Sequence, residues 1–89
     1  MNSNQIGKFE ISLRFAVDFP EKLASVFAML KLVPVRAEVL FHKDCIEYVA
    51  ISERFEEVPK GCIPPEYELE VESDDNGWPS AVIVKKETL

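Results

Sequence analysis

The residues with the clearest capacity for chemistry are four glutamates at alternate positions: Glu66, Glu68, Glu70 and Glu72. Side chains of a β-strand point alternately to opposite faces, and every second residue advances about 6.6 Å. That spacing is close to the spacing of successive phosphates on a nucleic-acid strand, so the row could imitate such a backbone in a basic groove. The other interpretation is a solvated sheet face, whose charge maintains solubility and prevents edge-to-edge pairing.

A second group of reactive side chains surrounds the single histidine. His42 lies near Asp44 and Cys45 in a predicted turn, and Cys62 is distant in sequence. A nucleophile needs a base in contact and a third group that orients the base, a geometry that a tight turn rarely provides. Structural zinc sites use paired, closely spaced Cys and His ligands, and only one such pair exists here. The three glycines stand too far apart for a phosphate-binding loop. We therefore predict no enzyme activity, no metal and no cofactor.

Composition and charge limit the class of partner. Eighty-nine residues make one domain, residues 1–89, with residues 1–7 expected as a disordered tail. The net charge is −6, and nine of the 16 acidic residues lie between Glu53 and Asp75. Direct nucleic-acid binding requires clustered Lys and Arg, so a protein partner, such as a basic host protein, is the more natural counterpart. The sequence has no apolar run of membrane-spanning length and no signal-peptide pattern at its start, which predicts a cytoplasmic protein with reduced thiols and without a membrane partner.

The first half of the chain predicts a strand, a helix and a hairpin. Apolar residues alternate over 8–17, which favours a strand. Asp18 and Glu21 have the spacing of a capping box, and the helix that they open should end before Pro34. Alternation over 35–41 and an apolar run over 45–52 predict two strands joined by a turn, the second of them central in its sheet.

The second half predicts a long loop and another hairpin. Prolines and a glycine interrupt residues 55–65, which predicts a loop, and long loops often carry function. Asn76-Gly77 is the signal for a two-residue turn. That turn predicts that Leu69 opposes Val84, that Val71 opposes Val82, and that Glu68 opposes Lys85. The predicted fold class is α+β, a two-layer sandwich with a mainly antiparallel five-stranded sheet and one helix, in the order β-α-β-β-β-β.

Most aromatic residues fall on apolar faces and are predicted to form the core: Phe9, Phe15, Phe19, Phe27, Phe41 and Tyr48. Phe55 and Trp78 lie beside loops, near prolines and acids, and a large aromatic with a polar rim is typical of an interface anchor. A lid over the open end of a small core is the alternative use of these two rings.

Three stretches resemble small accessory proteins of bacteriophages and prophages. They are Tyr48-Val49-Ala50-Ile51-Ser52, Phe55-Glu56-Glu57-Val58-Pro59-Lys60-Gly61 and Pro65-Glu66-Tyr67-Glu68-Leu69-Glu70-Val71, all between residues 48 and 71. The resemblance implies a phage-type protein of the host cytoplasm that acts on a host protein. It carries over no functional residue.

The leading interpretation is a non-enzymatic interaction module that binds another protein, or its own copy as a homodimer. The backbone of an exposed edge strand would provide affinity, and the loop residues Phe55, Pro64, Pro65 and Trp78 would provide shape. The alternative is an acidic inhibitor that uses the glutamate row to imitate nucleic acid and to block a host enzyme or defence complex.

Overall fold

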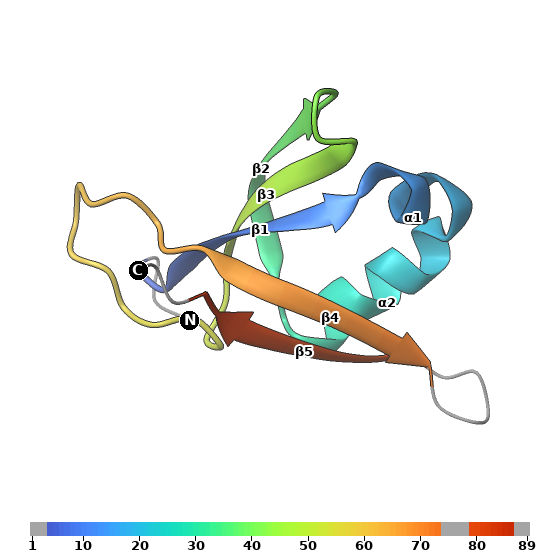
Figure 1. The fold of residues 1–89 in the computed structure, drawn as a ribbon. Helices are drawn as coiled ribbons and strands as arrows, with labels where there is room; N and C mark the ends of the chain where they lie inside the picture. Colours follow the sequence, from blue (N-terminus) through green and yellow to red (C-terminus); the bar gives the residue numbers. More distant parts are fainter. Residues whose placement is uncertain (1–3, 74–78, 87–89) are drawn as a thin grey trace.

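The computed structural model describes residues 4–73 and 79–86 of the chain (Figure 1). The elements are β1 (Ile6–Ser12), α1 (Leu13–Asp18), α2 (Pro20–Met29), β2 (Val33–Leu40), β3 (Cys45–Ile51), β4 (Tyr67–Ser73) and β5 (Pro79–Lys85). All strands within the sheets pair antiparallel. The predicted α+β class with antiparallel sheets is confirmed.

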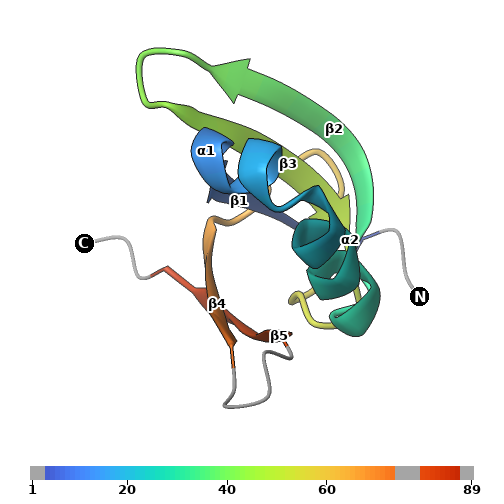
Figure 2. The same cartoon turned by 90° about the vertical axis from the view of Figure 1, so that its right-hand side faces the viewer.

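The strands form two sheets, so the prediction of a single five-stranded sheet with one helix is wrong. One sheet has the order β1-β3-β2, with β3 central as predicted, and β4 and β5 form a separate hairpin. The N–H of Lys8 donates to the carbonyl of Pro65 at 3.0 Å, and one parallel bridge joins Lys8 to Glu66. Beyond this bridge β1 and β4 diverge (Figures 1 and 2).

The predicted strand over residues 8–17 ends early, and two helices replace the predicted single helix. The Ser12 hydroxyl accepts a hydrogen bond from the N–H of Phe15 and caps α1. Asp18, predicted to cap the main helix, instead ends α1 and pairs with Arg14 at 3.6 Å. The main helix, α2, begins at Pro20 without a side-chain cap. Proline needs no hydrogen-bond partner for its nitrogen there.

The core lies where the helices face β1, β3 and the inner side of β4. Its buried apolar residues are Phe9, Ile11, Leu23, Val26, Leu30, Leu32, Ala50, Phe55 and Tyr67. Phe9 stacks on Tyr48 with ring centroids 5.6 Å apart and meets Phe27 edge-on at 5.9 Å. Offset stacked and edge-to-face rings add to the stabilisation that burial supplies. The core prediction is wrong for two rings, since Phe19 is 46% exposed and Phe41 is 84% exposed.

Strand β4 divides its side chains as predicted. Tyr67 is buried, and Leu69 and Val71 pack against the core, whereas Glu66, Glu68 and Glu70 are exposed. The side chain of Glu72 and the Asn76-Gly77 turn lie outside the described part of the chain.

The predicted register of the β4–β5 hairpin is wrong by one residue. Leu69 opposes Ile83, and Val71 opposes Ala81. Glu68 opposes Val84 instead of Lys85. A one-residue slip turns every side chain of a strand to the other face. The slip places Ala81 and Ile83 against the core and leaves Val82 and Val84 about half exposed.

Residues 4–7 belong to the fold rather than to a disordered tail. The carbonyl of Gln5 accepts a hydrogen bond from Ser52, and that of Asn4 accepts one from Val58. Strand β1 already begins at Ile6, and Gly7 is buried.

Candidate interaction surface on strand β2

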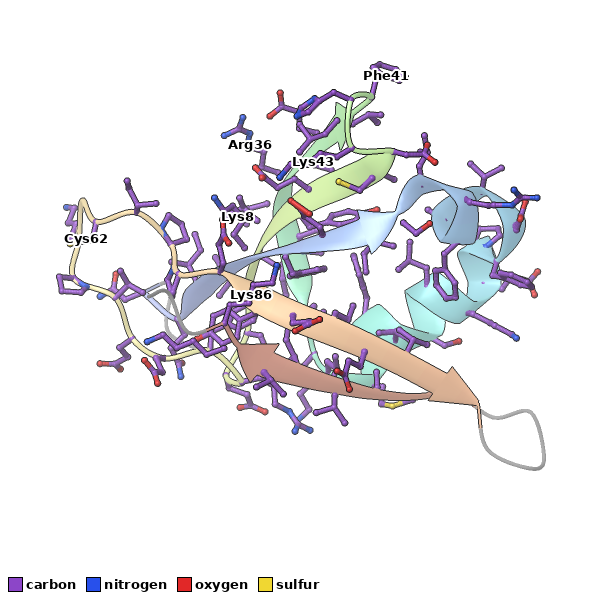
Figure 3. All side chains as sticks on the ribbon, viewed as in Figure 1. Lys8, Arg36, Phe41, Lys43, Cys62 and Lys86 are labelled. Carbon is purple, nitrogen blue, oxygen red and sulfur yellow. The ribbon has the colours of Figure 1, made fainter. Side chains whose placement is uncertain are left out.

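Among the elements whose burial is described at every residue, the outer strand β2 is the most exposed. Seven of its eight residues are exposed, and Leu40 is half-buried. Its apolar side chains share this exposure, with 48% for Val33, 52% for Val35 and 40% for Val39. Phe41, in the turn that follows, is 84% exposed and projects at the tip of the β2–β3 hairpin (Figure 3). An edge strand with apolar residues on a free surface is a template for pairing with another chain.

This exposure follows from the position of β2 in the sheet. Among the described residues, β3 is the only element that β2 contacts extensively. The helices pack on β1, β3 and β5 instead. Figure 2 shows β2 at the margin of the molecule, on the side of the sheet away from the β4–β5 hairpin. Ala37 stands opposite Tyr48, whose ring packs against Phe27 of α2, so Ala37 and Val39 lie on the face that carries the helices. Both residues are nevertheless exposed.

The hydrogen-bond pattern of β1 shows which backbone groups of β2 face outward. The N–H of Lys8 points away from β3, because it donates to Pro65. Opposed residues in an antiparallel ladder alternate between pairs that exchange backbone hydrogen bonds and pairs that do not. Lys8 and Val49 are therefore a pair without these bonds, so Val49 directs its backbone groups at its partner on β2, Arg36.

The same alternation assigns the rest of β2. Arg36 and Glu38 direct their N–H and C=O groups at β3, and Ala37 and Val39 direct theirs outward. No described residue pairs with this outer edge. A break in register between Pro34 and Arg36 places Val35 at a bulge, and Pro34 has no N–H to offer. The free edge is thus a short segment that ends at the bulge.

Charged side chains on β2 lie on the face opposite the helices. Arg36 Nη2 and Glu38 Oε2 are 2.8 Å apart. In Figure 3, Lys8, Arg36 and Lys43 extend from this face. Lys43 Nζ lies 3.2 Å from Glu10 Oε1, and this hydrogen bond raises the pKa of Lys43 above 10.5. The edge of β2 therefore combines an apolar side with a charged side.

The glutamate row lies on the outer face of the β4–β5 hairpin. Glu68 and Glu70 have no salt bridge with a described residue, whereas Glu66 Oε1 lies 3.3 Å from Lys8 Nζ. Val84 stands directly opposite Glu68, and Val82 stands directly opposite Glu70. These valines are 54% and 55% exposed. The observed register therefore interleaves carboxylates with apolar side chains, where the sequence predicted a Glu68–Lys85 pair. Lys85 instead pairs with Glu56 at 2.7 Å.

The loop residues proposed as interaction residues do not form one exposed surface in the part of the chain that the structure describes. Phe55 is only 2% exposed, and its ring packs on Tyr67 with centroids 4.5 Å apart. Phe55 therefore belongs to the core, which fits the alternative of a lid, and it is not an exposed anchor. Pro64 and Pro65 are half-buried. Trp78 lies outside the described residues. Ile63 is a large apolar residue of this loop that is 83% exposed. The sequence did not indicate it, because a lone isoleucine between loop residues gives no periodic signal.

The potentially reactive residues are dispersed. His42 is exposed in the β2–β3 turn, Cys45 is buried at the start of β3, and Cys62 is exposed in the long loop; both cysteines are free. Burial, and then the nearby Glu10 carboxylate, raise the pKa of the Cys45 thiol. Within residues 4–73 and 79–86 no three His, Cys, Asp or Glu side chains gather as metal ligands would.

Comparison with protein-family models, with curated proteins and with solved structures found no match to this chain. In the described part of the chain, neither helix has the length and apolar character needed to cross a membrane.

Proposed function

We propose that this protein is a non-enzymatic interaction module that binds a protein strand at the outer edge of β2. The observation that supports this proposal is the exposure of seven of the eight β2 residues, including Val35 and Val39. Backbone groups of Ala37 and Val39 give such a strand its hydrogen bonds. Alternate side chains of the edge then select the partner, as in other cases of strand addition.

Crosslinking from a defined position tests this binding site. A photoreactive benzophenone amino acid replaces Phe41, which lies at the end of β2 and is 84% exposed. The matched control carries the same amino acid at Val17, which is 70% exposed on α1. Both variants are irradiated in a bacterial lysate, the source that the resemblance to phage proteins indicates. We expect a discrete protein adduct from position 41 and none from position 17. Equal labelling from both positions, or no adduct from position 41, would contradict the proposal.

A second candidate function is the acidic inhibitor, and the exposure of Glu68 and Glu70, which form no salt bridge with a described residue, favours it. Because Val82 and Val84 share their face, the matching partner is a protein surface that is both basic and apolar. Replacing Glu68 and Glu70 by Lys should then abolish capture of a basic protein, and raised salt should weaken it. Capture of the same protein by the double variant would exclude this candidate.

A further inference from the structure

We propose that the strand bound at the β2 edge belongs to a second copy of this chain, paired antiparallel about a two-fold axis at Ala37. This inference rests on the proposed function, because it names the partner of the same edge. It goes further by fixing the register of the pair, which the residues of β2 determine in three steps.

The first step uses the direction of the backbone groups. In an antiparallel pair, a residue that faces the new partner must stand opposite another residue that faces it. A two-fold axis at Ala37 meets this condition, because it sets Ala37 opposite Ala37 of the second copy. Axes at Arg36 or at Glu38 meet it as well, because each sets outward-facing residues opposite each other. Axes nearer either end of β2 overlap fewer residues of the strand.

The second step uses charge. The axis at Ala37 sets Arg36 opposite Glu38 of the second copy, and it does so twice. The axis at Arg36 sets two arginines opposite each other, and the axis at Glu38 sets two glutamates opposite each other. Directly opposed like charges destabilise a strand pair, whereas opposite charges stabilise it. Charge therefore selects the Ala37 register.

The third step uses the apolar residues. In the Ala37 register, Val35 stands opposite Val39 of the second copy, and both valines are about half exposed in the single chain. A two-fold axis perpendicular to the sheet keeps the faces together. Ala37 and Val39 therefore join on the helix side, and the charges join on the other side.

The same geometry closes the assembly at two chains. An isologous two-fold pairing uses the same edge on both copies, so it leaves no second β2 edge for further growth. The other free edge of the sheet belongs to β1, and Pro65 and Glu66 already occupy part of it. The bulge at Val35 and the missing N–H of Pro34 end the paired segment.

Charge reversal tests this register in the full chain. The variants R36E and E38R each set like charges opposite each other in the homodimer, so we expect sedimentation velocity to show dimers weakened about tenfold or more. The double variant R36E/E38R restores opposite charges and should restore the dimer. An equimolar mixture of R36E and E38R should form a heterodimer, which native mass spectrometry separates by mass. The matched controls are R54E and E21R, exposed sites on the loop and on α2 that should leave the wild-type association unchanged.

Two outcomes would overturn the inference. A wild-type protein that sediments as a monomer at all concentrations would exclude the second copy. Single variants that dimerise as well as wild type would exclude the register. Neither outcome bears on the proposed function, because crosslinking at position 41 to a protein of another mass would still place a partner on β2. If the protein dimerises but position 41 gives no crosslinked adduct, the result would instead contradict β2 as the binding site.

Discussion

The ring of Phe55 packs on the ring of Tyr67 at 4.5 Å, and the Tyr67 hydroxyl accepts a hydrogen bond from the N–H of Glu56 at 3.0 Å. These contacts fix the beginning of the long loop to the beginning of β4. Gly7 lies directly against both rings. The pair thereby joins the two sheets at the point where β1 and β4 are bridged, although the sheets share little backbone pairing.

The first prediction concerns Gly7. A Cβ atom at this position would lie 2.8 Å from two ring carbons of Tyr67 and 2.9 Å from a ring carbon of Phe55. Both rings are buried and have no room to retreat. We expect Gly7→Ala to destabilise the fold by about 1–3 kcal/mol, the usual range for overpacking. Urea unfolding followed by circular dichroism measures the change, and an unaltered midpoint would contradict the close packing at Gly7.

The second prediction concerns the thiols. Cys62 is exposed, whereas Cys45 is 7% exposed and burial raises the pKa of its thiol. Because the thiolate is the reactive form, Cys45 has both less access to reagent and less thiolate at a given pH. We expect a disulfide reagent at pH 8 to modify Cys62 rapidly and Cys45 slowly, with both reacting at once in denaturant. Mass spectrometry of the digested protein identifies the sites, and equal native rates would show that Cys45 is accessible.

The sequence predicted elements well where one periodicity stood alone. Glu66, Glu68 and Glu70 alternate strictly with apolar residues, and only a strand with one wet face satisfies that pattern. The boundary at Ser12 was missed because Leu13 and Phe15 continue the alternation of β1. The same residues also suit a helix once the Ser12 hydroxyl caps it. Both a strand and a helix are compatible with these residues, and packing against α2 favours the helix.

The candidate surface could be foreseen only in part. An exposed edge strand was expected, but long-range pairing determines which strand lies at the edge. In the structure β3 is central, and β2 is therefore an edge strand. The prediction of Phe55 as an anchor relied on its position beside a loop, and tertiary packing placed it inside. The sequence shows that Arg36 and Glu38 flank Ala37, with Val35 and Val39 one residue further out. This symmetry indicates a partner only when the outer edge of β2 is known to be free.

The third prediction concerns alkaline pH. Burial raises the pKa of the Tyr48 hydroxyl above its ordinary value of 10.0. Between the unfolded and folded pKa values the unfolded chain releases a proton that the folded chain keeps, so Tyr48 favours unfolding as the pH rises above 10. We expect Tyr48→Phe, which keeps the contacts with Phe9 and Phe27, to lose less stability than wild type between pH 9 and pH 11. Urea midpoints at each pH provide the measurement, and parallel curves for the two proteins would exclude this contribution.

The last prediction separates the observed register of the β4–β5 hairpin from the one that the Asn-Gly turn signal favours. In the structure Ile83 packs against the core and Val84 is 54% exposed. Ile83→Ala should therefore cost about 2 kcal/mol, the low end for a buried isoleucine because this one is only partly covered. Val84→Ala, as the matched control, should cost less than about 1 kcal/mol, since an exposed strand residue contributes mainly through β-propensity. The turn-favoured register reverses this order, because it sets Val84 beside Leu69 on the inner face. The apolar run Ala81–Val84 suits either face, and in the structure Ala81 and Ile83 are the residues that pack against the core. Comparison of the urea midpoints of the two variants shows whether Ile83 or Val84 packs in the core.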